Sequence, residues 1–203
     1  HFMCGGVMIT ADGETSRPGV YACGEVAGGI HGADRAGGSA YSEMVVFGQR
    51  AGLAAARWAG AQPASKGEIA PGEATRNKIR NWTANTEGAL PGELWRRLNP
   101  LVDRRLGPLR TGTGLEQGLI EIEQLEEQLP RMRFERESDL RKALEMENLC
   151  LTARLVAQSA LARKESRGQH FREDHPRQND AWLRHVVIRR GAQGPLLELK
   201  NVT

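Results

Sequence analysis

The chain has 203 residues, of which 39% are hydrophobic and 26% charged, and a formal net charge of +3. This length can bury one good core or two modest ones, and the composition is that of an ordinary soluble protein. The small charge excess does not favour a nucleic-acid binder. Its apolar runs fall short of the roughly 20 residues that span a bilayer, and no signal segment opens the chain. We therefore expect a soluble, cytoplasmic protein with no direct membrane span.

The three cysteines, Cys4, Cys23 and Cys150, are far apart and form an odd count. This pattern favours neither a disulfide framework nor a zinc cluster, and we predict no metal site. We expect Cys23 and Cys150 to be buried small hydrophobic residues.

Residues 1–62 predict the C-terminal portion of an α/β domain, with short strands at about Val7–Thr10 and Val20–Cys23 and a helix over Ser39–Ala59. The small residues of that helix recur every three or four positions, which would let it lie close to a neighbouring backbone. A glycine-rich turn joins the second strand to the helix. Glycine has no Cβ and the first helical N–H groups lack intrahelical partners, so a flat or anionic ligand can approach such a turn closely.

Residues 63–72 are rich in glycine and proline and predict a linker, after which a helical domain is expected over residues 73–165. Its predicted helices are Glu73–Thr86, Pro91–Leu106, Leu115–Arg133 and Ser138–Lys164. Their shared apolar stripe indicates an antiparallel bundle, whose core we expect Trp82 and Trp95 to close.

Residues 166–203 predict a polar segment and a terminal β-hairpin, in which His185–Arg189 and Leu196–Leu199 flank a turn. The fold class is therefore α+β. Residues 165–172 form a polar cluster, which we interpret as a network that docks the helical domain on the N-terminal domain. A second catalytic or metal site is not favoured there, because the neighbouring histidines lack a convincing set of metal ligands.

Specific motifs stand at both ends of the chain. The N-terminal ones are His1-Phe2-Met3-Cys4-Gly5-Gly6, Gly24-Glu25, and His31-Gly32-Ala33-Asp34-Arg35-Ala36-Gly37-Gly38-Ser39-Ala40 with Glu43. The C-terminal ones are Arg110-Thr111-Gly112 and Lys164-Glu165-Ser166-Arg167-Gly168, followed by His170, Arg172, Asp174, Pro176, Trp182 and His185. Together they resemble, over nearly the whole chain, the C-terminal part of the flavoprotein subunit shared by succinate dehydrogenases, fumarate reductases and L-aspartate oxidases.

The resemblance implies an oxidoreductase that interconverts a dicarboxylate and its alkene with FAD as cofactor. It makes Arg35 the arginine that binds a substrate carboxylate, a task that suits a planar, permanently charged fork. The alternative for Arg35 is a structural pairing with Asp34. His1 would contribute a second substrate contact, while His31 would contact substrate or flavin or else pack the loop.

The resemblance also implies which residues bind the cofactor. Glu25 would accept hydrogen bonds from the ribityl hydroxyls of FAD, the alternative being a solvated loop glutamate. The backbone around the loop and the start of the helix would face the flavin, through Gly24, Gly38, Ser39, Ala40 and Tyr41.

The chain departs from the family pattern at Asp34, Ala36, Ser39 and Tyr41, where asparagine, leucine, asparagine and leucine are usual. A carboxylate beside Arg35 would compete with a substrate carboxylate, so the dicarboxylate stays open. The chain contains no dinucleotide-binding Gly-x-Gly-x-x-Gly motif and no counterpart of the family's proton-donating arginine, so we assign no catalytic residue. We expect the C-terminal part of a longer enzyme, without the N-terminal FAD-binding and capping regions, that alone binds FAD poorly and is inactive.

A rival hypothesis makes the chain an interaction module with no chemistry of its own. Its helical domain and hairpin would then bind an iron–sulfur electron-transfer subunit or a second copy of the chain. A partner of this kind could hold the protein at the inner face of a membrane. A third hypothesis, nucleic-acid binding, rests only on the basic residues. Flavin absorbance of the purified protein separates the enzyme from both rivals.

Overall fold

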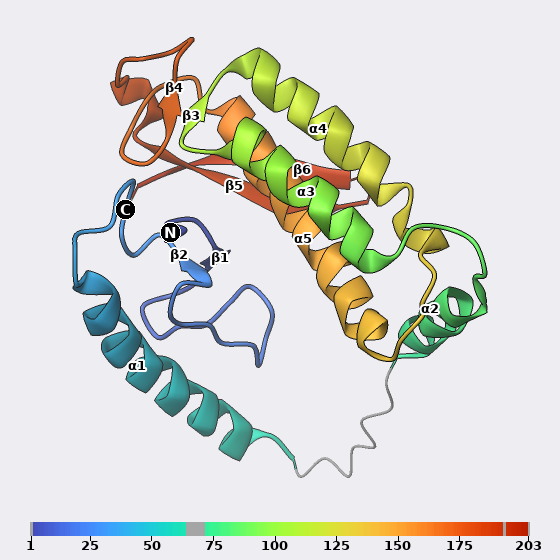
Figure 1. The fold of residues 1–203 in the computed structure, drawn as a ribbon. Helices are drawn as coiled ribbons and strands as arrows, with labels where there is room; N and C mark the ends of the chain where they lie inside the picture. The colour runs from blue at the N-terminus through green and yellow to red at the C-terminus, as the bar shows by residue number, and fades with distance from the viewer. Residues whose placement is uncertain (1, 64–71, 193, 203) are drawn as a thin grey trace. The chain divides into compact units, whose positions relative to one another are not determined.

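The computed structural model describes residues 2–63, 72–192 and 194–202 (Figure 1). Contacts within the chain divide it into two compact units, His1–Glu68 and Ile69–Thr203. Helices and short strands are mixed in it, and the predicted α+β fold is confirmed. Most of the predicted linker lies outside the described residues. Every helix in the described ranges is too short or too polar to cross a lipid bilayer.

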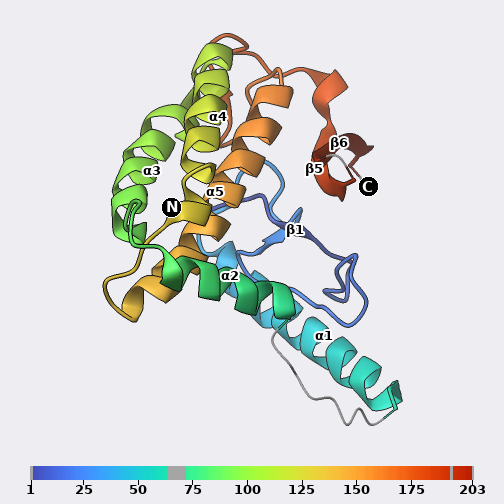
Figure 2. The same ribbon diagram turned by 90° about the vertical axis from the view of Figure 1, so that its right-hand side faces the viewer.

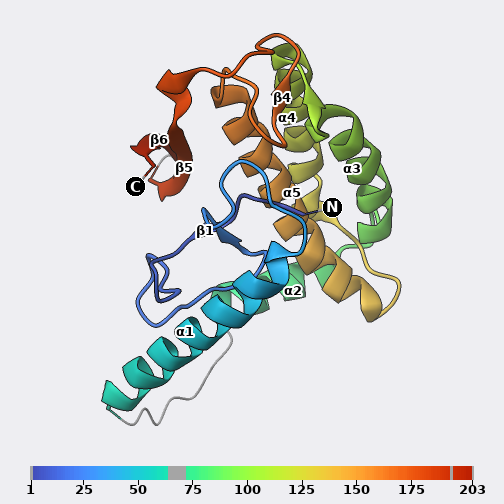
Figure 3. The same ribbon diagram turned by 90° about the vertical axis from the view of Figure 1, so that its left-hand side faces the viewer.

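The first unit consists of one long helix, α1 (Ser39–Ala61), with the loops of residues 2–38 along one side of it (Figure 3). The predicted helix is therefore confirmed, with two further residues at its end. Two short parallel strands, β1 (Val7–Met8) and β2 (Ala27–Gly28), hold the loops together.

Two glycine turns lie directly against α1. Gly13 and Gly19 have φ angles of +76° and +77°, a region that other residues rarely adopt. A Cβ added to Gly13 would lie 2.6 Å from the Cβ of Ala51, and one added to Gly19 would lie 2.6 Å from the Trp58 ring. The small residue at position 51 thus allows the close backbone approach that the spacing of small residues predicted.

The predicted strand Val20–Cys23 is wrong. The pairing there is a single antiparallel bridge between Glu14 and Tyr21, and the chain then turns at Gly24, which has a φ of +79°. Because the segment turns instead of continuing into a sheet, Cys23 is exposed and not buried as predicted.

The second unit is built on three long helices that pack side by side, α3 (Pro91–Leu106), α4 (Gly112–Glu126) and α5 (Ser138–Ala162) (Figure 2). Successive helices run in opposite directions, as an antiparallel bundle requires (Figure 1). A shorter helix, α2 (Glu73–Ala84), and the 3-10 turn η1 (Leu129–Arg131) lie at one end. The predicted bundle is confirmed.

The apolar stripes of these helices form one core. Its most deeply buried members include Trp82, Leu94, Ile122, Leu125, Met132, Ala143, Met146, Cys150 and Ala157, each at most 2% exposed. The indole Nε1 of Trp82 donates to the carbonyl oxygen of Leu129 at 2.8 Å, which satisfies the one polar atom of this buried ring. The burial of Cys150 is confirmed, whereas Trp95 is 49% exposed and does not close the core.

The predicted helix Leu115–Arg133 is displaced at both ends. α4 already begins after Thr111, whose side chain accepts from the Gly114 N–H at 3.0 Å as an N-cap. It ends before η1, because Pro130 lacks an N–H and disfavours helical geometry in the residue before it.

Two small sheets complete the unit. β3 (Leu109–Arg110) pairs in parallel with β4 (Phe171–Arg172), a contact that the sequence did not reveal. The predicted terminal hairpin is confirmed as β5 (Arg184–Gly191) and β6 (Gly194–Asn201). A 3-10 turn, η2 (Asp180–Trp182), leads into the hairpin.

Candidate functional site

The predicted ligand loop runs from Gly24 to Gly38 and ends at the N-terminus of α1. Its first turn is held from the helix, because the Gly24 N–H donates to Oε1 of Glu43 at 2.8 Å. Glu43 is only 5% exposed, so this bond is shielded from water. Gly38, with a φ of +81°, makes the sharp turn into the helix. Both ends of the loop are thus fixed by α1.

Residues 2–4 contact this loop at three of its predicted site residues. The Met3 N–H donates to Oε1 of Glu25 at 2.8 Å. The Phe2 ring meets the His31 ring edge-on, with centroids 5.2 Å apart and an interplanar angle of 77°. The guanidinium carbon of Arg35 lies 4.5 Å from the centroid of the same Phe2 ring. One aromatic ring therefore joins two of the three predicted substrate residues.

Of the predicted substrate residues, His1 lies outside the described residues. The Nε2 atom of His31 is buried and has no hydrogen-bond partner within the described part of the chain. A buried ring nitrogen without a partner is costly, and a ligand atom can satisfy it. This observation favours the ligand-binding interpretation of His31 over simple loop packing.

The backbone of the loop is open at several glycines. A Cβ placed on Gly29, Gly32, Gly37 or Gly38 would meet no atom within 4 Å, so the backbone is open to approach at all four positions. Glu25 is exposed, and its carboxylate has acceptor capacity beyond the bond from Met3. The glycine backbone and this acceptor fit FAD.

The backbone N–H groups at the start of α1 are the predicted donors to the flavin. The N–H groups of Ser39 and Tyr41 make long bonds of 3.2 Å to the carbonyls of Ala36 and Gly38, and the Ser39 hydroxyl also donates to Ala36. The Tyr41 side chain is 75% exposed. The helix N-terminus carries a partial positive charge that favours an electron-rich ring. The assignment of Gly24, Ser39, Ala40 and Tyr41 to the flavin stays a prediction.

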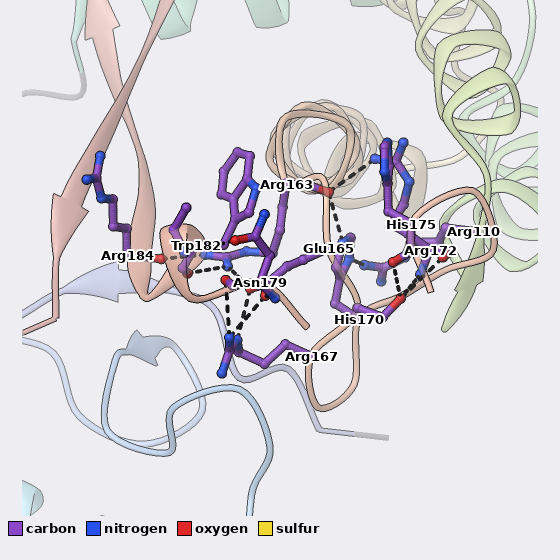
Figure 4. Close-up of polar contacts among 12 residues, drawn as sticks. Arg110, Arg163, Glu165, Arg167, His170, Arg172, His175, Asn179, Trp182 and Arg184 are labelled. Atoms are coloured by element: carbon purple, nitrogen blue, oxygen red, sulfur yellow. Dashed lines mark hydrogen bonds and ion pairs between the residues drawn. The ribbon is translucent and has the colours of Figure 1, made fainter. Parts of the chain in front are cut away.

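A second polar cluster, in the other unit, surrounds the ends of two bundle helices (Figure 4). Arg110 Nε donates to the carbonyl oxygens of Gly107 at 2.7 Å and Leu106 at 3.2 Å, at the end of α3. Its Nη1 lies 2.7 Å from Nδ1 of His170. The cation thus occupies a helix C-terminus, where the unpaired carbonyls and the helix dipole both stabilise positive charge.

Arg172 binds the free carbonyls at the C-terminal end of α5 and is only 2% exposed. Its Nη1 donates to the carbonyls of Ala160, Leu161 and Arg163 at 2.9, 3.1 and 3.2 Å. Its other nitrogens bind both carboxylate oxygens of Asp174 at 2.8 and 2.7 Å. The hydrogen bonds from Arg172 hold the pKa of that carboxyl well below its usual range.

Glu165, with no exposed surface, connects the end of α5 to the segment that leads into η2. It accepts from Arg163 at 2.6 Å, from Arg167 at 2.9 Å and from the Asn179 N–H at 2.9 Å. Arg163 in turn donates to the Trp182 carbonyl at 3.0 Å (Figure 4). These bonds lie within the second unit and are structural; the predicted docking role of the cluster stays a prediction.

His170 is held neutral in this cluster. Its Nδ1 accepts from Arg110, so its Nε2 carries the proton and faces the Arg163 carbonyl at 3.3 Å. Burial, and then the charge of Arg110, lower its pKa to about 4 from an ordinary 6.5. Between these values the unfolded chain binds more protons, so the contribution of His170 to stability is present above pH 6.5 and is lost as the pH falls towards 4.

We therefore expect the free energy of unfolding to fall more steeply with acid in the natural chain than in His170→Asn. Between pH 7 and pH 4.5, the free energy of unfolding should fall by about 1–2 kcal/mol more in the natural chain than in His170→Asn. This follows from about 1.4 kcal/mol per pKa unit, reduced for partial solvent access. Urea unfolding at the two pH values measures it. His175→Asn is the control, since the side chain of His175 is 39% exposed. Parallel pH profiles for the natural chain and His170→Asn would contradict the assignment.

The contacts of Phe2 and Glu43 at the first site were not predicted from the sequence, although both residues stand in the motifs. An aromatic next to a functional histidine suggests core packing, and only the three-dimensional structure places it between Arg35 and His31. For Glu43, an acidic residue in an apolar helix was the available signal, because a buried carboxylate needs a hydrogen-bond donor.

Comparisons with known proteins match both units. Residues 95–203 match the family model described as fumarate reductase flavoprotein C-term. Residues 1–40 match the model described as FAD binding domain.

Individual relatives agree with these matches. One subunit of the fumarate reductase (CoM/CoB) of Methanothermobacter marburgensis is 36% identical over 94% of this chain and 35% of its own length. The fumarate reductase flavoprotein subunit of Mycobacterium tuberculosis is 32% identical over 97% of this chain and 36% of its own length. The solved structure of Mycobacterium smegmatis Sdh1 in complex with UQ1 has a TM-score of 0.91 at 29% identity, over 100% of this chain and 36% of that one. The chain thus spans about a third of the length of these relatives.

Proposed function

Because the chain belongs to the fumarate reductase flavoprotein C-terminal family, we propose that it forms part of an FAD-dependent oxidoreductase that interconverts a dicarboxylate and its alkene. The family and the cofactor were both predicted from the motifs, and both predictions are confirmed. The rival interaction module is not favoured, since the chain also matches an FAD binding domain.

One observation carries the proposal. The Phe2 ring gathers Arg35 and His31 beside a glycine loop that is open at four positions and ends at a helix N-terminus. A permanently charged fork, a buried ring nitrogen and an accessible backbone are the groups that an anionic substrate and a flat cofactor need at adjoining positions.

FAD, when bound, supplies the chemistry of hydride exchange. The residues of this chain bind and orient. Arg35 binds one substrate carboxylate through two parallel hydrogen bonds. His31 Nε2 would donate to the substrate or the cofactor, and Glu25 would accept from cofactor hydroxyls. The positive end of α1 would favour negative charge on the cofactor.

The partners proposed for the whole protein follow from the same family. The electron-transfer partner is an iron–sulfur subunit, which would also give the protein a place at the cytoplasmic face of a membrane. The alternative is self-association of the chain. A pull-down of the holoenzyme followed by iron analysis distinguishes the two.

The test of the function uses the purified holoenzyme. It should contain about one FAD per polypeptide and oxidise a reduced dye when fumarate is added. Each result is read separately, by flavin absorbance and by dye oxidation. Protein without flavin would refute the cofactor assignment, and flavoprotein that leaves fumarate unreduced and succinate unoxidised would refute the proposed reaction.

A further inference from the structure

We propose that Phe2 is a positioning residue that sets the guanidinium of Arg35 and the imidazole of His31 as a pair for one substrate carboxylate. The inference rests on the proposed function, since it assigns a role at the same site. It concerns a residue that does not itself bind the substrate.

The contacts of residues 2–4 converge on Arg35. Phe2 contacts its guanidinium, with 4.5 Å from the guanidinium carbon to the ring centroid. The thiol of Cys4 lies next to the backbone of Arg35. Burial raises the pKa of this thiol, and a hydrogen bond with the Arg35 backbone partly offsets the rise. Met3 is bonded through its own N–H to Glu25. The short segment is therefore bonded to the loop at two places, and Phe2 immediately precedes this bonded pair, Met3 and Cys4.

The kind of contact suits a positioning role. A cation over an aromatic face is attracted through its charge, so the guanidinium loses freedom of movement while the contact itself uses none of its N–H donors. Arg35 also donates from Nη1 to the neighbouring Ala36 carbonyl at 3.3 Å, a long bond that a carboxylate can replace. An aliphatic residue at position 2 would fill much of the space but would lack the negative ring face that attracts the guanidinium.

His31 extends the argument. Its ring meets Phe2 edge-on, and its buried Nε2 has no hydrogen-bond partner in the described residues. A ring held in this way presents the nitrogen in one direction. Two donors of different chemistry are thus oriented by one ring, which fits a carboxylate, because that group accepts from two directions at once.

The experiment compares Phe2→Leu with Phe2→Tyr in the holoenzyme. We expect Phe2→Leu to raise the KM for fumarate about 3- to 30-fold, the range of a partly to fully desolvated cation–π contact, with a smaller change in kcat. Phe2→Tyr keeps the ring face and should stay within about twofold of the natural enzyme. Phe47→Leu is the matched control. The guanidinium carbon of Arg50 lies 5.8 Å from the centroid of the Phe47 ring, elsewhere on α1.

A double substitution excludes a merely structural effect. If Phe2 acts through both residues, then Phe2→Leu should raise the KM of an Arg35→Gln enzyme by less than it raises the KM of the natural enzyme, because only the contact with His31 is left to lose. Flavin content is measured in each variant, and Phe2→Met replaces Phe2→Leu if the latter loses its flavin. An unchanged KM in an active, flavin-loaded Phe2→Leu enzyme, or equal effects in both backgrounds, would overturn the inference. Inactivity of the natural holoenzyme would instead refute the proposed function.

Discussion

Arg35→Lys in the holoenzyme should lower kcat/KM for fumarate by about ten- to a hundredfold while the protein keeps its fold and its flavin. A lysine ammonium is a point charge and cannot reproduce the two parallel hydrogen bonds of a guanidinium. Losing one charge-assisted bond of this kind costs roughly 1.5–3 kcal/mol, which corresponds to that loss in rate. Steady-state kinetics at saturating reduced dye measures the change.

The chain offers a close control for this substitution. Arg50 also lies over a phenylalanine ring in the first unit, with its guanidinium carbon 5.8 Å from the centroid of Phe47. Arg50→Lys makes the same chemical change away from the loop, and we expect kinetics close to those of the natural enzyme. If Arg35→Lys behaved like this control, Arg35 would be a structural residue, in keeping with its alternative pairing with Asp34.

The second large effect concerns stability. Arg172→Met should lower the free energy of unfolding by about 3–5 kcal/mol, because buried acceptors that lose their donor each cost roughly 1–3 kcal/mol. The substitution leaves three carbonyls at the end of α5 without their common donor and removes the ion pair of Asp174. Urea unfolding of the chain, followed by helical circular dichroism, measures the loss.

An exposed ion pair of the same unit provides the comparison. Arg189 lies 3.5 Å from Glu198 on the hairpin, and their side chains are 53% and 46% exposed. Arg189→Met should change the unfolding free energy by less than about 1 kcal/mol, because solvent screens such pairs. Equal losses for the two variants would show that burial of Arg172 does not govern its contribution.

The sequence predicted the bounds of α3 but not those of α4. α3 has the predicted bounds, because Pro91 stands at its first turn and Glu93 bonds back to the Leu90 N–H at 2.8 Å. The end of α4 was missed, since an apolar pattern continues past the helix while Pro130 changes the backbone. The predicted strand Val20–Cys23 failed for a different reason: a short apolar run forms a strand only where a neighbour pairs with it.

The polar sites were also only partly predictable from the sequence. Family motifs placed Glu25, His31 and Arg35 in one loop, and the structure brings all three into contact with residues 2–4. The three carbonyl acceptors of Arg172 could not be predicted, because every residue has a backbone carbonyl. Such a bond depends on where a helix ends in space, and residue type carries no signal for that.

The bond from the Met3 N–H to Glu25 bears on natural variation at position 3. Since the donor belongs to the main chain and the Met3 side chain is 47% exposed, exchanging the side chain leaves the bond in place. Proline alone has no N–H to offer. The bond therefore tolerates any residue at position 3 that has a backbone N–H, and a proline there would remove the anchor of Glu25.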